Sequence, residues 1–254
     1  MSVYFFSKAW TYERAVVASS SGGTDVYPPS NATDYNRQTW WESDGGTPSL
    51  IIDLGMARTI DSLFLHEDMI TTFKLYHSPD NSNWTEVSDG TKAEKQAGIW
   101  WWFSFTEVSK RYWKIAVTAK GANNVKIYEL LLMELKLTLG ASDELELPSM
   151  VTITPKDTIG GNYSIVDGST TSYAGNKDYA EISIEFKNVS ATVRDNLYSL
   201  YTTPTLRCPL VILPDDDSPS YIYRCVWQDT AFNFGYSIPL KPAGFDGTLK
   251  FMEY

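Results

Sequence analysis

Apolar and polar residues alternate along most of the chain with a period of two. Between Ala180 and Phe186, alanine, isoleucine or phenylalanine occupies every second position, and glutamate or serine stands between them. Successive side chains of a strand point to opposite faces, so this pattern predicts a strand with one buried face. Shorter runs of the same kind predict strands at Leu50–Leu54, Ser62–Leu65, Phe73–Tyr76, Trp100–Phe105, Tyr112–Val117 and Ile127–Leu137.

Clusters of Gly, Pro, Asn and Asp separate these runs, for example at Gly45-Gly46 and at Pro79-Asp80-Asn81. These residue types favour turns. Many short strands with turn signals between them are typical of a sandwich or a jelly roll. The predicted fold class is therefore all-β.

One segment has helical spacing instead, with apolar residues at Val189, Val193, Leu197, Leu200 and Tyr201. Ser190 is available as an N-cap, and a proline follows at position 204. This predicts one amphipathic helix from about Ala191 to Tyr201, covering part of a second sheet.

The alternation is lost between residues 138 and 149, where acidic residues and a proline gather, and a new strand pattern begins at Val151. We therefore expect a first domain at residues 1–137, a linker at 138–149 and a second, β-rich domain with one helix at 150–254. Both domains have ordinary sizes.

The formal net charge is −10, with 21 Lys and Arg against 31 Asp and Glu. Nucleic acids and anionic membranes attract clustered positive charge, so neither is an expected partner. The chain shows no secretion signal and no run of the ~20 apolar residues that a membrane span needs.

The two cysteines, Cys208 and Cys225, fall on strands that we expect to be neighbours. A disulfide between them is geometrically possible. For a chain made in a reducing cytoplasm, two buried thiols are the expectation.

Sequence motifs of catalysis are not found. The chain has no P-loop, no H-E-x-x-H and no G-x-S-x-G, and no spacing marks a glycosidase pair of carboxylates. We therefore predict that the protein is not an enzyme.

Several blocks of the first half resemble the discoidin family, also called coagulation factor 5/8 type C, and they occur in that family's order. The blocks are the segment from Asn31 to Trp41, LIIDLG at 50–55, FKLYHSPDNSNW at 73–84, RYWKI at 111–115 and IYEL at 127–130. The family includes many carbohydrate-binding modules. The resemblance implies a galactose-binding-like jelly roll over roughly residues 1–136.

Within such a sandwich, specific residues of these blocks gain structural roles. The carboxylate of Asp53 would satisfy turn amides, and Gly55 would allow a tight backbone. Trp41 and Trp84 are expected as bulky residues of the core.

Many relatives hold a structural calcium ion beneath the early loop, and Asp34, Thr39 and Glu129 are the matching positions here. Hard oxygen ligands suit that ion. The family often has Gly after the Asp, whereas Tyr35 stands here. The alternatives are a bound calcium and a metal-free loop held by hydrogen bonds.

The resemblance also implies ligand-binding loops at one end of the sandwich, where an aromatic platform and polar groups meet. Two segments are candidates: His66-Glu67-Asp68 and Trp100-Trp101-Trp102. His66 follows a strand, like a histidine of phage-associated relatives; the alternative is a loop histidine without a ligand. Three consecutive Trp side chains alternate faces, so they cannot all be core.

The second half resembles small β-domains of bacteriophage tail proteins. The leading hypothesis is therefore a non-enzymatic structural protein of a phage tail (tip, baseplate or tube) whose discoidin-like module binds a glycan or a partner. Its expected partners are other tail or virion proteins, a host-surface glycan and further copies of itself. Its expected location is the virion, after assembly in the host cytoplasm. The alternative is a free carbohydrate-binding lectin or an accessory module of an enzyme complex.

Overall fold

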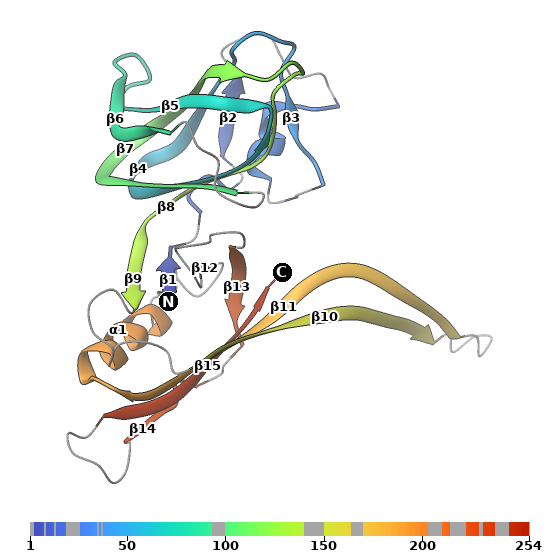
Figure 1. Ribbon diagram of the computed structural model, residues 1–254, viewed down its shortest axis with the longest axis vertical. Helices are drawn as coiled ribbons and strands as arrows, with labels where there is room; N and C mark the ends of the chain where they lie inside the picture. Colours follow the sequence, from blue (N-terminus) through green and yellow to red (C-terminus); the bar gives the residue numbers. More distant parts are fainter. Residues whose placement is uncertain are drawn as a thin grey trace. The chain divides into compact units, whose positions relative to one another are not determined.

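The computed structural model describes residues 3–7, 9–12, 14–18, 26–34, 36, 38–92, 100–139, 150–163, 170–202, 210–213, 222–228, 231–236 and 244–253. These residues form a mostly β structure with one α-helix (Figure 1). The elements are β1 (Val3–Phe6), β2 (Ala15–Ala18), the 3-10 helix η1 (Pro29–Thr33), β3 (Trp41–Glu42), β4 (Ser49–Asp68), β5 (Ile70–Ser78), β6 (Thr85–Lys92), β7 (Trp100–Lys120), β8 (Lys126–Met133), β9 (Leu135–Leu139), β10 (Met150–Tyr163), β11 (Thr170–Val189), α1 (Ala191–Thr202), β12 (Leu210–Leu213), β13 (Tyr223–Trp227), β14 (Phe234–Tyr236) and β15 (Phe245–Glu253).

The chain divides into two compact units. The first, called here the sandwich unit, comprises Tyr4–Leu137 and Leu213–Ile222. The second, called here the C-terminal unit, comprises Met1–Val3, Thr138–Ile212 and Tyr223–Tyr254. Each unit is described by itself below.

The sandwich unit consists of two antiparallel layers that share the long strands β4 and β7. The first half of β4 pairs with β2 and with the end of β7, and that end of β7 also pairs with β5, which pairs with β6. The second half of β4 pairs with the start of β7 and with β8, and β8 pairs with β3. The predicted strands at 50–54 and 62–65 are thus two halves of one bent strand.

The bend in β4 shows why an Asp-Leu-Gly sequence stands at this point. Asp53 Oδ1 accepts a hydrogen bond from the backbone N–H of Gly55 (2.8 Å), and Gly55 has φ +77°, which glycine adopts without strain. The guanidinium of Arg111 donates two hydrogen bonds to the Asp53 carboxylate, at 2.7 and 2.8 Å. The role predicted for Asp53 is confirmed, and Arg111 adds a cross-strand clamp.

The core lies between the two layers and is built by the alternation seen in the sequence. Its largest fully buried side chains include Trp41, Trp101 and Trp113. Trp41 is buried as predicted. The prediction for Trp84 is wrong, because this side chain is only half-buried and its ring lies against Lys114 Nζ at 4.4 Å.

The C-terminal unit is organised around an antiparallel sheet with the strand order β10-β11-β15-β13-β12, with β14 pairing to β15. Figure 1 shows β10 and β11 side by side as a long curved ribbon. In β11, Ala180, Ile182, Ile184 and Phe186 are buried, as their alternation predicted.

Helix α1 begins and packs as its sequence predicted. Ser190 Oγ accepts a hydrogen bond from the backbone N–H of Val193 (3.2 Å), which satisfies one of the free amides at the helix start. Val193, Leu197 and Leu200 are buried. No helix within the described ranges has both the length and the apolar character that crossing a bilayer requires.

Cys225 lies buried on β13, and burial raises the pKa of its thiol far above the ordinary value. Cys208 lies outside the described residues, so the predicted pair of buried thiols is seen at one position only.

Candidate functional site

The end of strand β4 divides the first predicted ligand segment between two faces. Leu65 and Glu67 point to the core, and Glu67 is only 4% exposed. His66 and Asp68 lie on the opposite face and are half-buried. The alternation of a strand therefore separates Glu67 from its two neighbours.

Glu67 and Trp101 hold each other inside the core. Trp101 Nε1 donates a hydrogen bond to Glu67 Oε1 (2.8 Å), and the backbone N–H of Ile70 donates to Glu67 Oε2 (2.7 Å). Trp101 is 1% exposed. Because both side chains are buried, neither is placed to contact a ligand at the surface.

The other two tryptophans of the triplet, Trp100 and Trp102, do not add a described side chain to a pocket either. Trp102 is half-buried on the outer face of its layer, stacked on Phe64 with the ring centroids 5.8 Å apart and edge-on to Phe6. Trp100 pairs through its backbone with His66, and its side chain lies outside the described part. As the alternation requires, Trp101 and Trp102 point to opposite faces.

His66 stacks on Tyr128 of the neighbouring strand β8, with ring centroids 4.6 Å apart. The register shifts here, because His66 lies opposite Glu129 whereas Glu67 lies opposite Ile127. Tyr128 is therefore an extra residue in β8, a bulge of the kind that redirects side chains.

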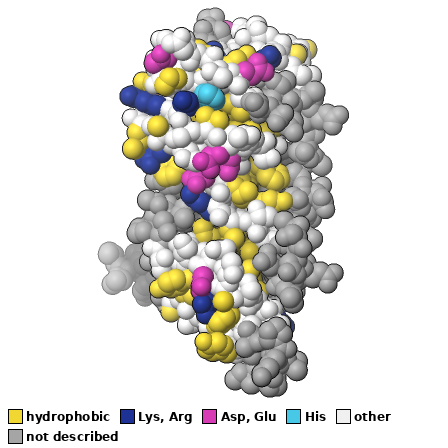
Figure 2. Space-filling model, turned by 90° about the vertical axis from the view of Figure 1, so that its left-hand side faces the viewer, with side chains coloured by type: hydrophobic (Ala, Val, Ile, Leu, Met, Phe, Trp, Pro, Cys, Tyr) yellow, Lys and Arg dark blue, Asp and Glu magenta, His cyan; other side chains and the backbone are white. Residues whose placement is uncertain are grey.

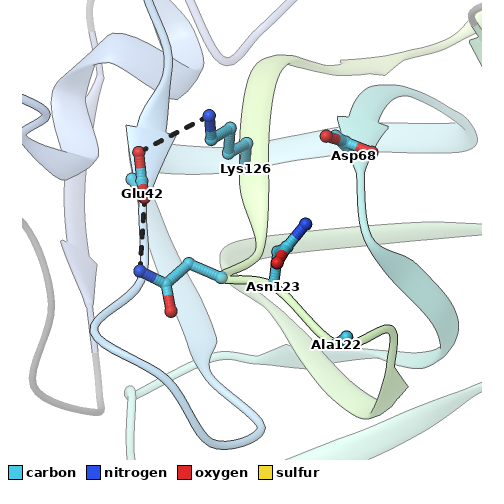
Figure 3. Close-up of a pocket in the computed structure, with 6 residues that line it drawn as sticks. Glu42, Asp68, Ala122, Asn123 and Lys126 are labelled. Carbon is cyan, nitrogen blue, oxygen red and sulfur yellow. Dashed lines mark hydrogen bonds and ion pairs between the residues drawn. The ribbon is translucent and has the colours of Figure 1, made fainter.

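A row of charged residues crosses three neighbouring strands next to this bulge. Glu42 on β3 lies opposite Lys126 on β8, and Lys126 lies opposite Asp68 on β4. Together with the loop residues Ala122, Asn123 and Asn124, this row lines an open pocket of about 420 Å³. In Figure 3, Glu42 and Asp68 lie on opposite sides of the hollow, with Lys126 and Asn123 between them.

Glu42 is the most connected polar side chain of the pocket. Its Oε2 accepts a hydrogen bond from Trp40 Nε1 (3.2 Å), and its Oε1 accepts one from Asn124 Nδ2 (3.2 Å). Lys126 Nζ lies 3.8 Å from Glu42 Oε2. The hydrogen bond from Trp40, followed by those other partners, holds the pKa of the Glu42 carboxyl below its ordinary value despite partial burial.

An aromatic surface adjoins this pocket. Tyr27 lines a second hollow of about 250 Å³ that shares Glu42 and Asn124 with the first. The Tyr27 ring stacks on Trp40 at 4.8 Å, and Trp40 in turn contacts Tyr128 at 5.8 Å. Lys126 Nζ lies 5.1 Å from the centre of the Trp40 ring.

This arrangement combines the two kinds of group that recognise a sugar. Carboxylates, amides and an ammonium can exchange hydrogen bonds with hydroxyls, and the faces of aromatic rings can pack on the apolar face of a sugar ring. An open hollow lined by both kinds of group suits a small polar ligand.

Of the six ligand residues predicted from sequence, Asp68 lines the pocket and His66 joins the aromatic surface through Tyr128. The sequence reasoning missed Glu42, Asn124 and Lys126. Trp40-Trp41-Glu42 offered one usable signal, since two adjacent Trp residues on a strand must also face opposite ways. Nothing in the sequence placed this segment beside residues 122–126.

The predicted calcium residues lie in a loop that is already well connected. Asp34 Oδ1 accepts a hydrogen bond from the backbone N–H of Asn36 (2.8 Å), and Asp34 Oδ2 lies 2.7 Å from the hydroxyl of Thr39. Glu129 is fully buried. Among the described residues, no three His, Cys, Asp or Glu side chains gather into a metal-holding group, so any ion here would depend on Thr39 or backbone oxygens as well.

Charges are mixed on the described part of the face that Figure 2 shows. On the face that Figure 2 shows, Lys and Arg side chains lie among Asp, Glu and apolar ones, without one continuous basic surface in the part that is coloured.

Comparison with known proteins places the pocket within a recognised domain. Residues 15–130 match the F5/8 type C domain family and lie wholly inside the sandwich unit. The resemblance that the sequence blocks predicted is thus confirmed over residues 15–130. The match does not extend to the C-terminal unit. No curated protein matches the chain.

Two similar solved structures illustrate the extent of the likeness. Chitosan-binding module 1 of a chitosanase/glucanase from Paenibacillus sp. IK-5 is 20% identical, and the match covers 49% of this chain and 97% of that one with a TM-score of 0.44. The family 32 carbohydrate-binding module of NanJ from C. perfringens, solved with galactose, is 23% identical, and the match covers 51% and 99% with a TM-score of 0.42.

Proposed function

We propose that the sandwich unit binds a glycan in the pocket between β3, β8 and the end of β4, and that it does so without catalysis. The observation that supports this proposal most directly is that a polar pocket and an aromatic surface lie next to each other. Glu42 and Asn124 belong to both hollows, so one ligand can contact the polar groups and the Tyr27 ring together.

The state of Glu42 supports binding rather than hydrolysis. A glycosidase needs one carboxyl group whose pKa is raised, so that it can protonate the leaving oxygen. Hydrogen bonds from Trp40 and Asn124 lower the pKa of Glu42 instead. An ionised Glu42 can accept hydrogen bonds from sugar hydroxyls but cannot act as that acid near neutral pH.

The test is a glycan array followed by calorimetry on the full chain and on two matched tryptophan variants. Trp40→Ala removes a ring of the aromatic surface. Trp84→Ala removes a half-buried ring that lies against Lys114. Trp84 follows the C-terminal end of β5, whereas Asp68 of the pocket precedes its N-terminal end. We expect Trp40→Ala to weaken binding by about tenfold or more and Trp84→Ala to leave it unchanged.

Two results would count against the proposal. One is the absence of binding to every glycan on the array, and the other is an equal loss in the two variants. Turnover of a bound glycan that disappears with a single acidic substitution would overturn the non-catalytic part.

A structural calcium ion at Asp34, Thr39 and Glu129 remains part of the proposal. Carboxylate and hydroxyl oxygens are the ligands that calcium prefers, and a fully buried carboxylate such as Glu129 requires compensation by a cation or by donors. The hydrogen bonds within the loop support the metal-free alternative. The two alternatives differ in how the stability of the protein responds to calcium removal.

The place of the protein in a phage tail stays a prediction. The F5/8 type C match ends at residue 130. The proposed glycan binding does not require that the protein belong to a phage tail. Light scattering of the purified chain tests the predicted homo-oligomer, and co-sedimentation with tail extract tests the predicted virion partners. A monomer that never sediments with tails would leave the free lectin or accessory module as the function.

A further inference from the structure

The row Glu42–Lys126–Asp68 carries more negative than positive charge. Lys126 stands between two carboxylates in the register, and its ammonium is 3.8 Å from Glu42 Oε2. One cation can balance only one of the two carboxylates. Whichever carboxylate Lys126 pairs with, the other one is left without that cation.

In the structure the uncompensated group is Asp68. Its side chain lines the hollow and is half-buried, and it has no hydrogen bond or ion pair to any residue in the described ranges. The other cation of the adjacent loop is Lys120, whose Nζ donates to the backbone carbonyl oxygens of Asn123 (2.8 Å) and Gly121 (3.4 Å). Lys120 is therefore engaged with the loop backbone and does not line the pocket.

We propose that this pocket selects glycans that carry a free, protonated amino group, with Asp68 as the residue that recognises the ammonium. The inference rests on the proposed glycan-binding function and names its ligand class. An ammonium offers three N–H donors and a full positive charge to an otherwise uncompensated carboxylate. The amides of Asn123 and Asn124 remain for the neutral hydroxyls of the same ligand.

The same charge pattern disfavours acidic glycans. A sugar carboxylate or sulfate would have to draw Lys126 away from Glu42 and would then face two carboxylates with one cation. Like charges at this range are repulsive, and the repulsion counts more in a hollow than in open water.

Three trisaccharides with the same β-1,4-linked backbone test the inference. They differ at carbon 2 of each ring: the glucosamine trimer carries an ammonium, its N-acetylated counterpart an acetamide, and cellotriose a hydroxyl. Calorimetry uses the full chain at low salt and at a pH that keeps the amines protonated. We expect the glucosamine trimer to bind about tenfold more tightly than cellotriose, since hydrogen bonds between charged groups are the stronger kind.

Two conservative variants assign the preference to Asp68. Asp68→Asn keeps the size of the side chain, and we expect it to bring the affinity for the glucosamine trimer within about twofold of that for cellotriose. Glu107→Gln removes one negative charge from an exposed position of β7 outside both hollows, and we expect it to leave the tenfold preference in place.

The outcomes separate this inference from the proposed function. Equal binding of all three trimers, or a preference for the acetamide, overturns the amino-sugar inference while glycan binding stands. A preference that Glu107→Gln removes as fully as Asp68→Asn overturns the role of Asp68, because overall charge would then be the cause. Absence of binding to these trimers and to every arrayed glycan overturns both.

Discussion

Two neighbouring rows of residues cross strands β3, β8 and β4 one position apart, and they differ in burial. Trp41, Ile127 and Glu67 form one row and are buried. Glu42, Lys126 and Asp68 form the other and line an open pocket. Each row contains a glutamate that accepts a hydrogen bond from a tryptophan indole: Trp101 donates to Glu67, and Trp40 donates to Glu42.

The comparison shows that two carboxylates with the same kind of hydrogen-bond donor differ in their exposure to solvent. Glu67 is 4% exposed, and both of its oxygens accept hydrogen bonds from the protein. The Glu42 side chain is 24% exposed and borders solvent-filled space. We infer that Glu67 serves stability and that Glu42 serves binding.

Substitutions in the buried row should reduce stability most. Glu67→Ala leaves the indole N–H of Trp101 and the backbone N–H of Ile70 without their acceptor inside the core. Each buried, unsatisfied donor costs about 1–3 kcal/mol, so we expect the free energy of unfolding to fall by about 3 kcal/mol. Urea unfolding followed by tryptophan fluorescence measures the change.

Trp101→Phe is the matched variant, because it removes one donor and keeps an aromatic ring. It should cost less than Glu67→Ala, by about half. If the folded fraction of either variant binds glycan more weakly than wild type, the buried row contributes to binding and the division fails.

The sequence predicted the strands that contain the buried row. It could not predict which residues of these strands form the buried row and which form the open one. Alternation identified strands at 62–65 and 127–137 and showed that three successive tryptophans must divide between faces. The bulge at Tyr128 shifts the pairing of β8 by one residue, so the face of each residue beyond it depends on a local irregularity that no periodicity encodes. The predicted strand 127–137 is two strands, β8 and β9, separated at Glu134.

The pocket could be predicted only in part. Asp68 was predicted because the family resemblance implies ligand-binding loops, and the segment 66–68 was interpreted as one of them. Glu42 and Lys126 belong to strands that are distant in sequence and become neighbours only through the register of β3 with β8. The helix was the easier case, because the spacing of its apolar residues and the cap at Ser190 are local.

Glu129 provides the next test, since it is a second fully buried glutamate of the same sheet. If calcium compensates it, adding calcium at about 100 times its dissociation constant should raise the free energy of unfolding by about 2.7 kcal/mol. Thermal unfolding with calcium and with a chelator measures this. Asp34→Ala and Glu129→Gln should each remove the calcium effect.

A free energy of unfolding that does not change with calcium would support the metal-free loop. The loop would then be held by the bonds of Asp34 to Asn36 and Thr39 alone, and Asp34→Ala would destabilise the protein to the same extent with and without chelator.

The open row should respond in binding more than in stability. Glu42→Gln keeps the size of the side chain and removes the charge that faces Lys126 at 3.8 Å. Because partly exposed ion pairs contribute little, we expect the free energy of unfolding to change by less than about 1 kcal/mol. Affinity for a neutral trisaccharide should fall by about tenfold if the carboxylate binds hydroxyls. A large loss of stability with unchanged affinity would reverse the roles assigned to the two glutamates.

The smallest effect concerns pH. Hydrogen bonding, first by Trp40, lowers the pKa of Glu42 in the folded protein below the ordinary value of 4.5. A lowered carboxyl pKa contributes stability above the unfolded-state pKa, and this contribution is lost as the pH falls through the folded-state value. Asp53, whose pKa the hydrogen bonds of Arg111 lower, acts in the same direction, whereas burial raises the pKa of Asp61 and acts in the opposite one.

Between pH 6 and pH 3, wild-type stability should therefore fall slightly more steeply than that of Glu42→Gln, as measured by urea unfolding across the range. Parallel pH curves for the two proteins would show that Glu42 is no better stabilised in the fold than in the unfolded chain, and the open row would then have no electrostatic share in stability at all.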